Sequence, residues 1–418
     1  MKYRLPSILT CLAIGYHVPA NAEQQQPSSP AIGCEPQAGQ VDELAAISDE
    51  IECYAETINL ALTKQRETTQ RLREVAAQRR QTSGGSALEK AKVDDGLDAN
   101  ALMGGSSIPK SSAPDVVGAF RFLCGPGQLS YNDPLVYPGQ KGKSHLHQFF
   151  GNLEADENST YESLRASGES TCTSDLNRSA YWIPALLTGD GNVVRPRAVS
   201  VYYKRRPASD EWFEQFGNEA AGLPRGLSYI FGWDSNRRTE RQYNASSFKC
   251  SGKGKSVKGT MSEVLADCPA GSTFIANITS PDCWNGKDLT ASDNRSHMAR
   301  MKRDRNSGKA SCSKSHRYVL PKFTLTVVYD IEAGDVPSNW MFASDHMVPE
   351  AWREPGYSFH ADWFGAWNDE ALAAWQDGCI DKQLNCSDGN LGTGKRLKRN
   401  AHYPGEDYER IVPVPARP

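Results

Sequence analysis

The stretch KFTLTVVYDIE, residues 322–332, decides the fold class. Its large apolar and aromatic side chains recur at every second position, at Phe323, Leu325, Val327 and Tyr329. Because side chains two residues apart leave the same face of an extended chain, the pattern predicts a strand with one buried face. The Val and Thr residues of the stretch favour the same structure.

Further strand patterns surround this one, whereas helix patterns are scarce. Strands are expected in RPRAVSVYYKRR (195–206), GAFRFLC (118–124), LSYIFGW (227–233) and STFIANI (272–278), and helices only in SDEWFEQFGNEAAG (209–222) and NDEALAAWQDGC (368–379). Strands and helices do not alternate, so a parallel sheet is not expected. The sequence predicts a mainly β fold: an antiparallel, jelly-roll-like β-sandwich with long disulfide-bridged loops, preceded by an N-terminal helical segment.

The first 22 residues have the pattern of a secretory signal peptide. Lys2 and Arg4 precede a short apolar run, and Ala20 and Ala22 provide small residues for cleavage. No later run of eighteen apolar residues exists, so no membrane span is expected. The formal charge of −3 does not indicate a broad basic surface for nucleic acid. A secreted or periplasmic protein is predicted.

Cysteine usage fits an exported chain. Beyond the signal peptide the count is even, which in an oxidising compartment favours disulfides over thiolate metal sites. The ten residues are Cys34, Cys53, Cys124, Cys172, Cys250, Cys268, Cys283, Cys312, Cys379 and Cys386. Sequence cannot fix their connectivity, and pairing in chain order is the shortest-loop expectation.

The rest of the chain divides by composition. Residues 23–40 are rich in Gln, Pro and Ser and are expected to be disordered, whereas residues 41–81 show helical, near-heptad periodicity. That segment is either an oligomerising or tethering coiled coil, through which the protein would self-associate, or an amphipathic helix packed on something else. Residues 82–115 are expected to be a linker, 116–386 the β-rich domain and 387–418 a tail.

Two pairs of polar residues are candidates for a functional centre. His145 and His147 form an H-x-H pair in KSHLHQFFGN, and His360 and Asp362 form an H-x-D pair in YSFHADWFGAWND. On strands, each pair would project from one face. If the pairs meet, they could hold zinc or another divalent ion, or act as a general acid and base without metal. A hydrogen-bonded polar core is the structural alternative, and the sequence leaves all three open.

Further histidines and aromatic residues are candidates for roles around this centre. His297 and His316, in SHMA and CSKSHRYVLP, are candidate catalytic acid–base or supporting groups. Many tryptophans flank Gly, Asp, Asn or Pro, and such rings can form platforms for sugars, although most Trp residues are simply core. The candidate substrate-binding rings are Tyr181, Trp182, Trp284 and Trp363.

The ordered motifs of the main domain resemble a known family. They include YNDPLVYPGQKGKSHLHQFFGN, SAYWIPAL, PDCWNGKDL, SDNRSHMA, CSKSHRYVLP and HADWFGAWND, and they extend from about residue 118 to 380. The chain is similar to secreted proteins that carry a domain of unknown function, common in filamentous fungi beside cell-wall-binding WSC modules and also present in bacteria. The resemblance covers the six candidate catalytic residues and implies a polysaccharide or cell-wall context, but no reaction. Asn285 departs from the acidic residue frequent at its position.

Three functions are therefore expected from the sequence. The first is an exported hydrolase or lyase of extracellular or cell-wall polysaccharide, with catalytic centre His145, His147, His360 and Asp362, assisted by His297 and His316. The second is a non-catalytic glycan-binding or envelope-tethering module. The third is a metal-dependent hydrolase of a non-carbohydrate substrate.

Overall fold

The computed structural model describes residues 52, 54–64, 67, 89–237, 242, 245–253, 255–305, 308–400, 402 and 408–418. The chain divides into two compact units, Met1–Leu72 and Arg73–Pro418. In the first unit, residues 54–64 are helical, as the periodicity predicted, and Tyr54 and Ile58 are 50% and 58% exposed. A coiled-coil partner for these side chains remains a prediction. The described residues include no helix long and apolar enough to cross a membrane.

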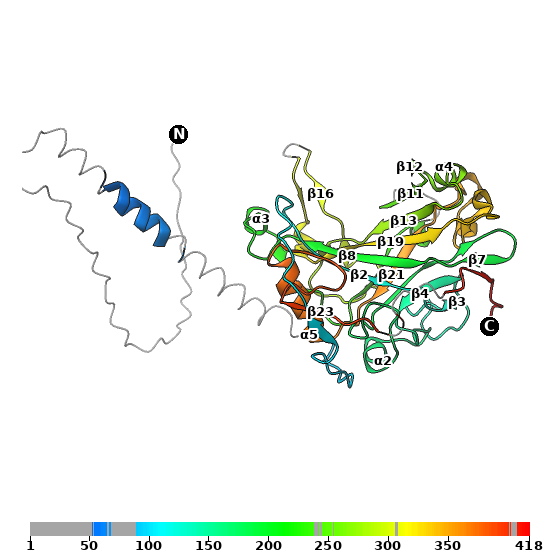
Figure 1. Cartoon of the computed structure of the whole chain (residues 1–418), viewed down its shortest axis with the longest axis horizontal. Helices are drawn as coiled ribbons and strands as arrows, with labels where there is room; N and C mark the ends of the chain where they lie inside the picture. Colours follow the sequence, from blue (N-terminus) through cyan, green and yellow to red (C-terminus); the bar gives the residue numbers. More distant parts are fainter. Residues whose placement is uncertain are drawn as a thin grey trace, which may run out of the picture. The chain divides into compact units, whose positions relative to one another are not determined.

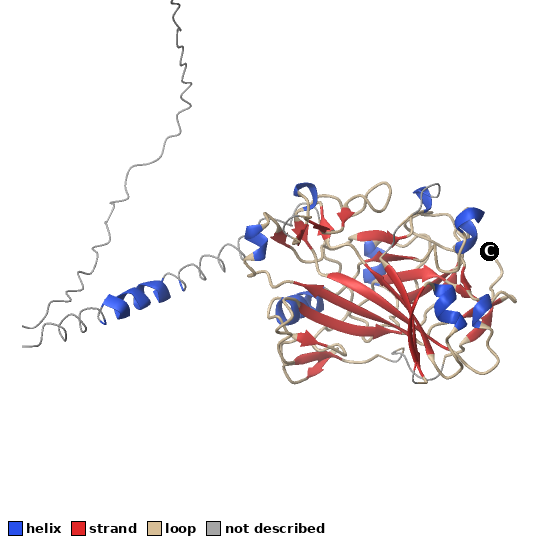
Figure 2. Ribbon diagram, turned by 90° about the horizontal axis from the view of Figure 1, so that it is seen from above, coloured by secondary structure: helices blue, strands red, loops and turns tan. Residues whose placement is uncertain are grey.

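Two antiparallel sheets dominate the second unit (Figures 1 and 2). The larger sheet has the order β12-β11-β13-β19-β8-β2-β22, with one parallel pair at the β2–β22 edge. Its strands are β2 (Gly118–Cys124), β8 (Ala198–Arg205), β11 (Ser246–Gly252), β12 (Lys255–Gly259), β13 (Thr273–Thr279), β19 (Lys322–Asp330) and β22 (Asn385–Cys386). The smaller sheet has the order β10-β21-β5-β4-β3. Its strands are β3 (Leu129–Ser130), β4 (His147–Gly151), β5 (Ala180–Pro184), β10 (Ser228–Gly232) and β21 (His360–Phe364).

The core lies between these two sheets and confirms the predicted β-sandwich. The alternate side chains of β19 that the sequence singled out are all 0% exposed. The Phe323 ring of this strand lies with its centroid 6.0 Å from the ring of Tyr181 on β5 and 5.4 Å from that of Trp363 on β21. Burial of these rings on both sheets supplies the main stabilisation, since each aromatic removes a large apolar area from water.

Smaller sheets and short helices surround the sandwich. The small sheets comprise β1 (Met103–Gly105) with β23 (Lys395–Leu397); β9 (Glu219–Ala220), β14 (Cys283–Trp284), β15 (Met298–Ala299) and β18 (Tyr318–Val319); β16 (Lys302–Arg303) with β17 (Ala310–Ser311); and β6 (Leu186–Leu187), β7 (Asn192–Val194), β20 (Met341–Phe342) and β24 (Ile411–Pro413). The α-helices are α2 (Tyr161–Ala166), α3 (Trp212–Gln215), α4 (Met261–Ala266) and α5 (Asp369–Trp375). Short 3-10 turns are η1 (Ser235–Arg237), η2 (Lys314–His316), η3 (Pro337–Asn339), η4 (Asp345–Met347) and η5 (Glu350–Trp352), and η6 (Gln376–Ile380) is a π-helical turn.

The helices expected from the sequence form, but one is much shorter. Asn368 caps α5, accepting hydrogen bonds from the N–H groups of Glu370 and Ala371, as its position before the helical pattern indicated. In contrast, the stretch 209–222 contains only the four-residue α3 before the chain turns at Gly217 and enters β9. The positive φ of 60° at Gly217 suits a residue without a Cβ.

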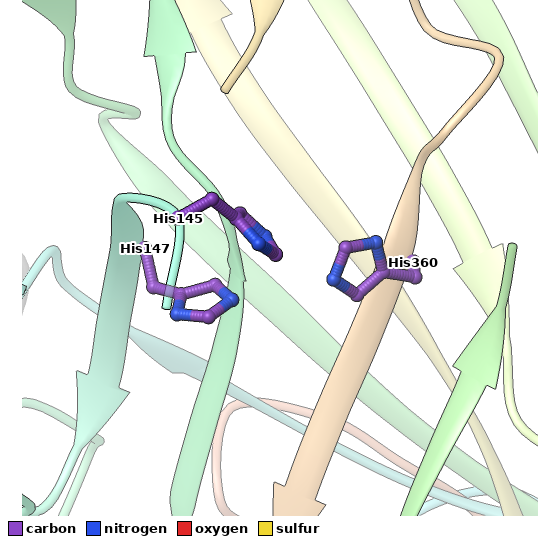
Figure 3. Close-up of side chains that lie close together, drawn as sticks. All are labelled: His145, His147 and His360. Carbon is purple, nitrogen blue, oxygen red and sulfur yellow. The ribbon is translucent and has the colours of Figure 1, made fainter. Parts of the chain in front are cut away.

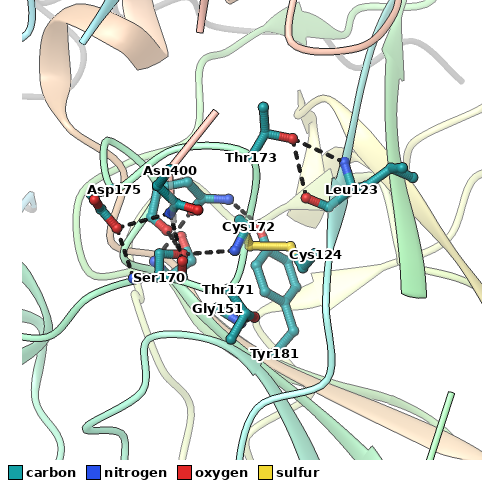
Figure 4. Close-up of a disulfide and its surroundings, with 12 residues drawn as sticks. Leu123, Cys124, Gly151, Ser170, Thr171, Cys172, Thr173, Asp175, Tyr181 and Asn400 are labelled. Carbon is teal, nitrogen blue, oxygen red and sulfur yellow. Dashed lines mark hydrogen bonds between the residues drawn. A yellow bond between two sulfur atoms is a disulfide. The ribbon is translucent and has the colours of Figure 1, made fainter. Parts of the chain in front are cut away.

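Four disulfides join the cysteines of the second unit in chain order. They are Cys124–Cys172, Cys250–Cys268, Cys283–Cys312 and Cys379–Cys386. The pair expected from Cys34 and Cys53 lies outside the described residues. Figure 4 shows the first bridge among loop hydrogen bonds, including those from the Asn400 amide to Ser170 O at 2.6 Å and to Asp175 Oδ1 at 3.0 Å.

The segments on either side of the predicted domain are folded, which corrects the expected linker and tail. From residue 89 the chain packs on the body, and β1 pairs with β23 of the expected tail. Asp95 forms a buried ion pair with Arg165 of α2. Near the C-terminus, β24 pairs with β7. Composition missed these pairings because Gly, Ser and Pro suppress local signals, whereas backbone pairing across hundreds of residues depends on the tertiary structure.

Candidate functional site

Strand register places His147, His360 and Asp362 on one face of the five-stranded sheet. Residues directly opposite one another share a face, and here Phe149 faces Trp182, which faces Asp362 across the next strand pair. His147 and His360 lie two residues along their strands from Phe149 and Asp362, so they project from the same side. The opposite side of this sheet is the sandwich core. The i, i+2 spacing therefore directs these polar groups away from that core.

His145 joins this set from the turn before β4, and Figure 3 shows the three rings facing one another. Its ring centroid lies 4.1 Å from that of His147 and 5.1 Å from that of His360. One nitrogen of each ring lies within 4.8 Å of the corresponding nitrogens of the others. Tetrahedral zinc with Zn–N bonds of about 2.0–2.1 Å needs nitrogens roughly 3.3 Å apart, so modest side-chain rotations would close the set around one ion.

Backbone carbonyls leave the ε nitrogens of these rings for another partner. Nδ1 of His360 lies 2.8 Å from Ser358 O, and Nδ1 of His147 lies 3.3 Å from Asn132 O. A proton on Nδ1 donates to each carbonyl and leaves a lone pair on Nε2. Nε2 of His145 and of His147 is buried with no hydrogen-bond partner. Because an unpaired buried polar atom is costly, these two nitrogens fit metal ligation.

The electrostatic environment keeps all three imidazoles neutral at pH 7. Burial is the main cause: it lowers the pKa of His147 to about 3 and that of His360 to about 4. Burial, followed by the neighbouring histidines, holds the pKa of His145 well below its usual value. Metal ligation requires the neutral ring, so no proton has to be removed from these side chains at neutral pH.

Two carboxyl groups lie beside the histidines. Oδ2 of Asp362 is 3.9 Å from Nε2 of His360, too far for a hydrogen bond, and has no hydrogen-bond partner. Burial raises the pKa of Asp362 well above its usual value. Asp133 accepts hydrogen bonds from the N–H groups of Leu135 and Val136, and burial raises its pKa to about 6.

A cavity of about 200 Å³ opens onto this cluster, over ten times the space that one water needs. Its lining residues are Asp133, Val136, Tyr137, Lys143, Ser144, His145, Ile230, Trp233, Ser235, Arg295, His346, Met347, His360, Asp362 and Arg417. His147 is fully buried behind this lining, whereas His145 is half-buried. The four residues predicted as the centre therefore meet beside one cavity.

The other two predicted histidines lie elsewhere and have both ring nitrogens bonded. His297 is buried between the N–H of Ala291 and the carbonyl of Ser228, at 3.3 and 3.0 Å. His316 contacts Ser315 Oγ at 2.9 Å and Ser296 O at 2.8 Å. Neither residue lines the cavity. This geometry supports structural roles for both, and their expected assistance in catalysis stays a prediction.

None of the four predicted substrate-binding rings lines the cavity. Tyr181 and Trp363 are 0% and 1% exposed on the core face of the sheet. Trp182 is fully buried and stacks on Phe149, and the Trp284 indole donates to Asp288 O at 2.7 Å. The expected role of these rings in facing a ligand is therefore not supported at this cavity. Flanking Gly, Asn and Asp residues marked loops but did not indicate which rings stayed exposed.

Sequence reasoning missed several cavity residues, among them Asp133, Trp233, His346 and Arg417. They come from separate loops and from the C-terminal segment, so no local pattern joins them. One further residue, Asp345, holds a residue next to the site in place through hydrogen bonds. Its carboxylate accepts hydrogen bonds from the N–H of Ser358 at 3.1 Å and its Oγ at 2.6 Å, fixing the residue whose carbonyl orients His360.

Fold and site together define a disulfide-bridged β-sandwich protein with a three-histidine pocket at one sheet. The family model described as "Domain of unknown function (DUF1996)" matches residues 133–367, more than half of the chain, and the chain belongs to this family. The match lies within the span expected from the sequence motifs and contains all three pocket histidines. No curated protein and no solved structure matches the chain.

Proposed function

We propose that His145, His147 and His360 bind a divalent transition metal, and that the pocket cleaves extracellular or cell-wall polysaccharide by hydrolysis or elimination. The observation that carries the proposal is the pair of buried, unpartnered Nε2 atoms of His145 and His147 beside His360 and an open cavity. Three neutral imidazoles with one open side are a ligand set for zinc and related metals.

The metal, when bound, would act as a Lewis acid towards a water or a substrate oxygen on the cavity side. The protein's own groups then supply orientation and proton transfer. Ser358 O and Asn132 O hold the rings of His360 and His147 through their Nδ1 atoms. Asp362 Oδ2, close to His360 and without a hydrogen-bond partner, is positioned as the acid–base group.

The polysaccharide part rests on context and on the cavity walls. The expected signal peptide and the wall-associated proteins that the sequence resembles favour an extracellular glycan. Tyr137 and Trp233 contribute aromatic surface to a cavity that also has polar groups, a combination suited to a sugar ring. The glycan-tethering alternative depended on exposed tryptophans, and the burial of Trp182 and Trp363 weakens it.

Metal content and product release test the proposal together. Purified protein should contain one equivalent of a transition metal, and it should release reducing ends or unsaturated sugars from a polysaccharide panel. Chelation and the His145→Ala variant should abolish both properties, and zinc should restore the chelated protein. His316→Ala, outside the pocket, is the matched control and should keep both. A metal-free protein with full activity, or equal losses in the two variants, would contradict the proposal.

A further inference from the structure

Three cationic side chains line the same cavity as the histidines, and they differ in how their charge is used. Arg295 is committed to the protein, since its Nε lies 3.6 Å from Asp234 Oδ1 and its Nη2 donates to Trp233 O at 2.7 Å. Lys143 and Arg417 are different. Among the described residues, neither has a carboxylate partner within 4 Å, although both line the cavity.

Arg417 is held in place by neutral contacts. Its guanidinium lies over the Tyr131 ring, 4.5 Å from the centroid, and Nη1 donates to Gly142 O at 2.9 Å. The Tyr131 hydroxyl donates to Pro415 O at 3.2 Å, so the same tyrosine holds the segment that carries the arginine. These contacts orient the cation without neutralising it, and they leave further N–H donors for a ligand.

Lys143, which directly follows the Gly142 whose carbonyl accepts from Arg417, is held by similar neutral contacts. Its Nζ lies 5.5 Å from the centroid of the Tyr137 ring and donates to Gln140 Oε1 at 2.6 Å. Both partners are neutral. Lys143 also lies two residues before His145, so the chain that positions this histidine also positions the cation beside the cavity.

Among the described residues, neither carboxyl group of the cavity forms an ion pair with Lys143 or Arg417. Asp133 and Asp362 are 3% and 1% exposed, and Asp133 is occupied with the N–H groups of Leu135 and Val136. The charge of Arg417 is close enough to contribute to the lowered pKa of His145. The whole chain has a formal charge of −3, so these two cations at the cavity are a local feature and not the result of a generally basic surface.

We propose that Lys143 and Arg417 bind an anionic group on the sugar, a carboxylate or a sulfate ester, so that the substrate is an acidic polysaccharide. This inference rests on the proposed function for its polysaccharide substrate and adds the charge class. Carboxylate and sulfate oxygens match the N–H donors of an arginine, and the contacts with Tyr131 and Tyr137 orient the two cations before a ligand binds. Because Arg417 lies outside the family segment 133–367, the C-terminal segment of this chain contributes directly to substrate choice.

Dextrans of matched length test the charge class directly. Binding of plain dextran, carboxymethyl dextran and dextran sulfate is measured calorimetrically on chelated, metal-free protein at low and physiological salt. The double variant Lys143→Gln/Arg417→Gln is compared with a control double variant, Lys302→Gln/Lys314→Gln, whose lysines are exposed outside the cavity. Circular dichroism and melting temperatures establish that all variants are folded.

The charged dextrans should bind wild type at least about tenfold more tightly than plain dextran, as two partly exposed ion pairs allow, and salt should weaken this preference. The pocket variant should lose most of it and the control variant should retain it. The charged dextran that binds more tightly shows whether the pocket prefers a carboxylate or a sulfate ester. Equal binding of all three polymers, no binding of any, or equal losses in both variants would overturn the inference. Since metal is removed, a failed metal centre would leave this result unchanged.

Discussion

Asp345 offers a demanding test of how the site is supported, through the variant Asp345→Asn. This fully buried carboxylate accepts four hydrogen bonds. Oδ2 accepts from the N–H groups of Phe342 at 2.8 Å and Gly356 at 2.9 Å, and Oδ1 accepts from the N–H and hydroxyl of Ser358. An asparagine keeps one acceptor oxygen and replaces the other with an NH₂ group, which is itself a donor.

The magnitude follows from this count. With its NH₂ group turned towards Ser358, the asparagine leaves the Ser358 N–H without an acceptor, whereas the Ser358 hydroxyl can accept from this NH₂ group and donate to Ser344 Oγ, 2.6 Å away. One buried, unsatisfied donor costs about 1–3 kcal/mol, so the variant should lose about 1–3 kcal/mol of unfolding free energy. The loss of the contacts to Ser358 should also loosen the carbonyl that orients His360, and zinc affinity should fall about 10–100-fold, as for other groups that orient metal ligands.

Urea denaturation followed by tryptophan fluorescence measures the first effect, and zinc titration of folded protein measures the second. Asp293→Asn is the matched control, because the exposed Asp293 also accepts two backbone N–H groups, from Arg295 and Ser296. Both N–H groups donate to Oδ1, which an asparagine can keep, and the site is open to water, so the control should lose under about 1 kcal/mol. Equal losses in the two variants, or a loss below 1 kcal/mol for Asp345→Asn, would refute the reasoning.

Three further predictions concern the core, the disulfides and pH. Phe323→Ala should lose about 3–5 kcal/mol in urea denaturation, whereas Val328→Ala on the half-exposed face of the same strand should lose under about 1.5 kcal/mol; similar losses would contradict the assigned core. The double variant Cys124→Ser/Cys172→Ser should lose about 4 kcal/mol in the same assay, from the entropy of a loop with a separation of 48 residues, and an unchanged midpoint would rule out that contribution. In metal-free protein the pocket histidines have pKa values below the unfolded value of 6.5, so the unfolded chain binds more protons in acid. Each histidine should lower the unfolding free energy by about 1.4 kcal/mol per pH unit below 6.5, until its folded pKa is reached at about 4 for His360. The raised pKa values of the pocket carboxyl groups partly offset this loss, and denaturation midpoints that rise steadily from pH 6.5 to 5 would contradict the sign.

The sequence predicted those parts of the structure that have a local period. Alternation in β19 indicated the buried face, and the i, i+2 spacing of His360 with Asp362 indicated a shared side of β21. The same spacing did not place His145 on a strand, because it lies in the turn before β4. Contacts between residues far apart in the chain could not be predicted from the sequence. Arg417 enters the cavity only because β24 pairs with β7, and no pattern near residue 417 encodes that pairing.

The sequence also did not predict which aromatic residues would be buried away from the cavity. Trp182 and Trp233 both neighbour loop-forming or polar sequence and both are buried, yet Trp233 lines the cavity and Trp182 does not. Which of them meets the cavity depends on the packing of two sheets and their loops, which local sequence does not determine. The linker and tail were misjudged for the same reason.

X-ray absorption of the zinc-loaded protein shows whether the three pocket histidines hold the ion, because it counts the imidazole ligands of the bound zinc. We expect one zinc per chain with three imidazole nitrogens at about 2.0–2.1 Å, and loss of one imidazole in His147→Gln. An unloaded protein, a shell of oxygen ligands alone, or a spectrum unaltered by His147→Gln would contradict this expectation.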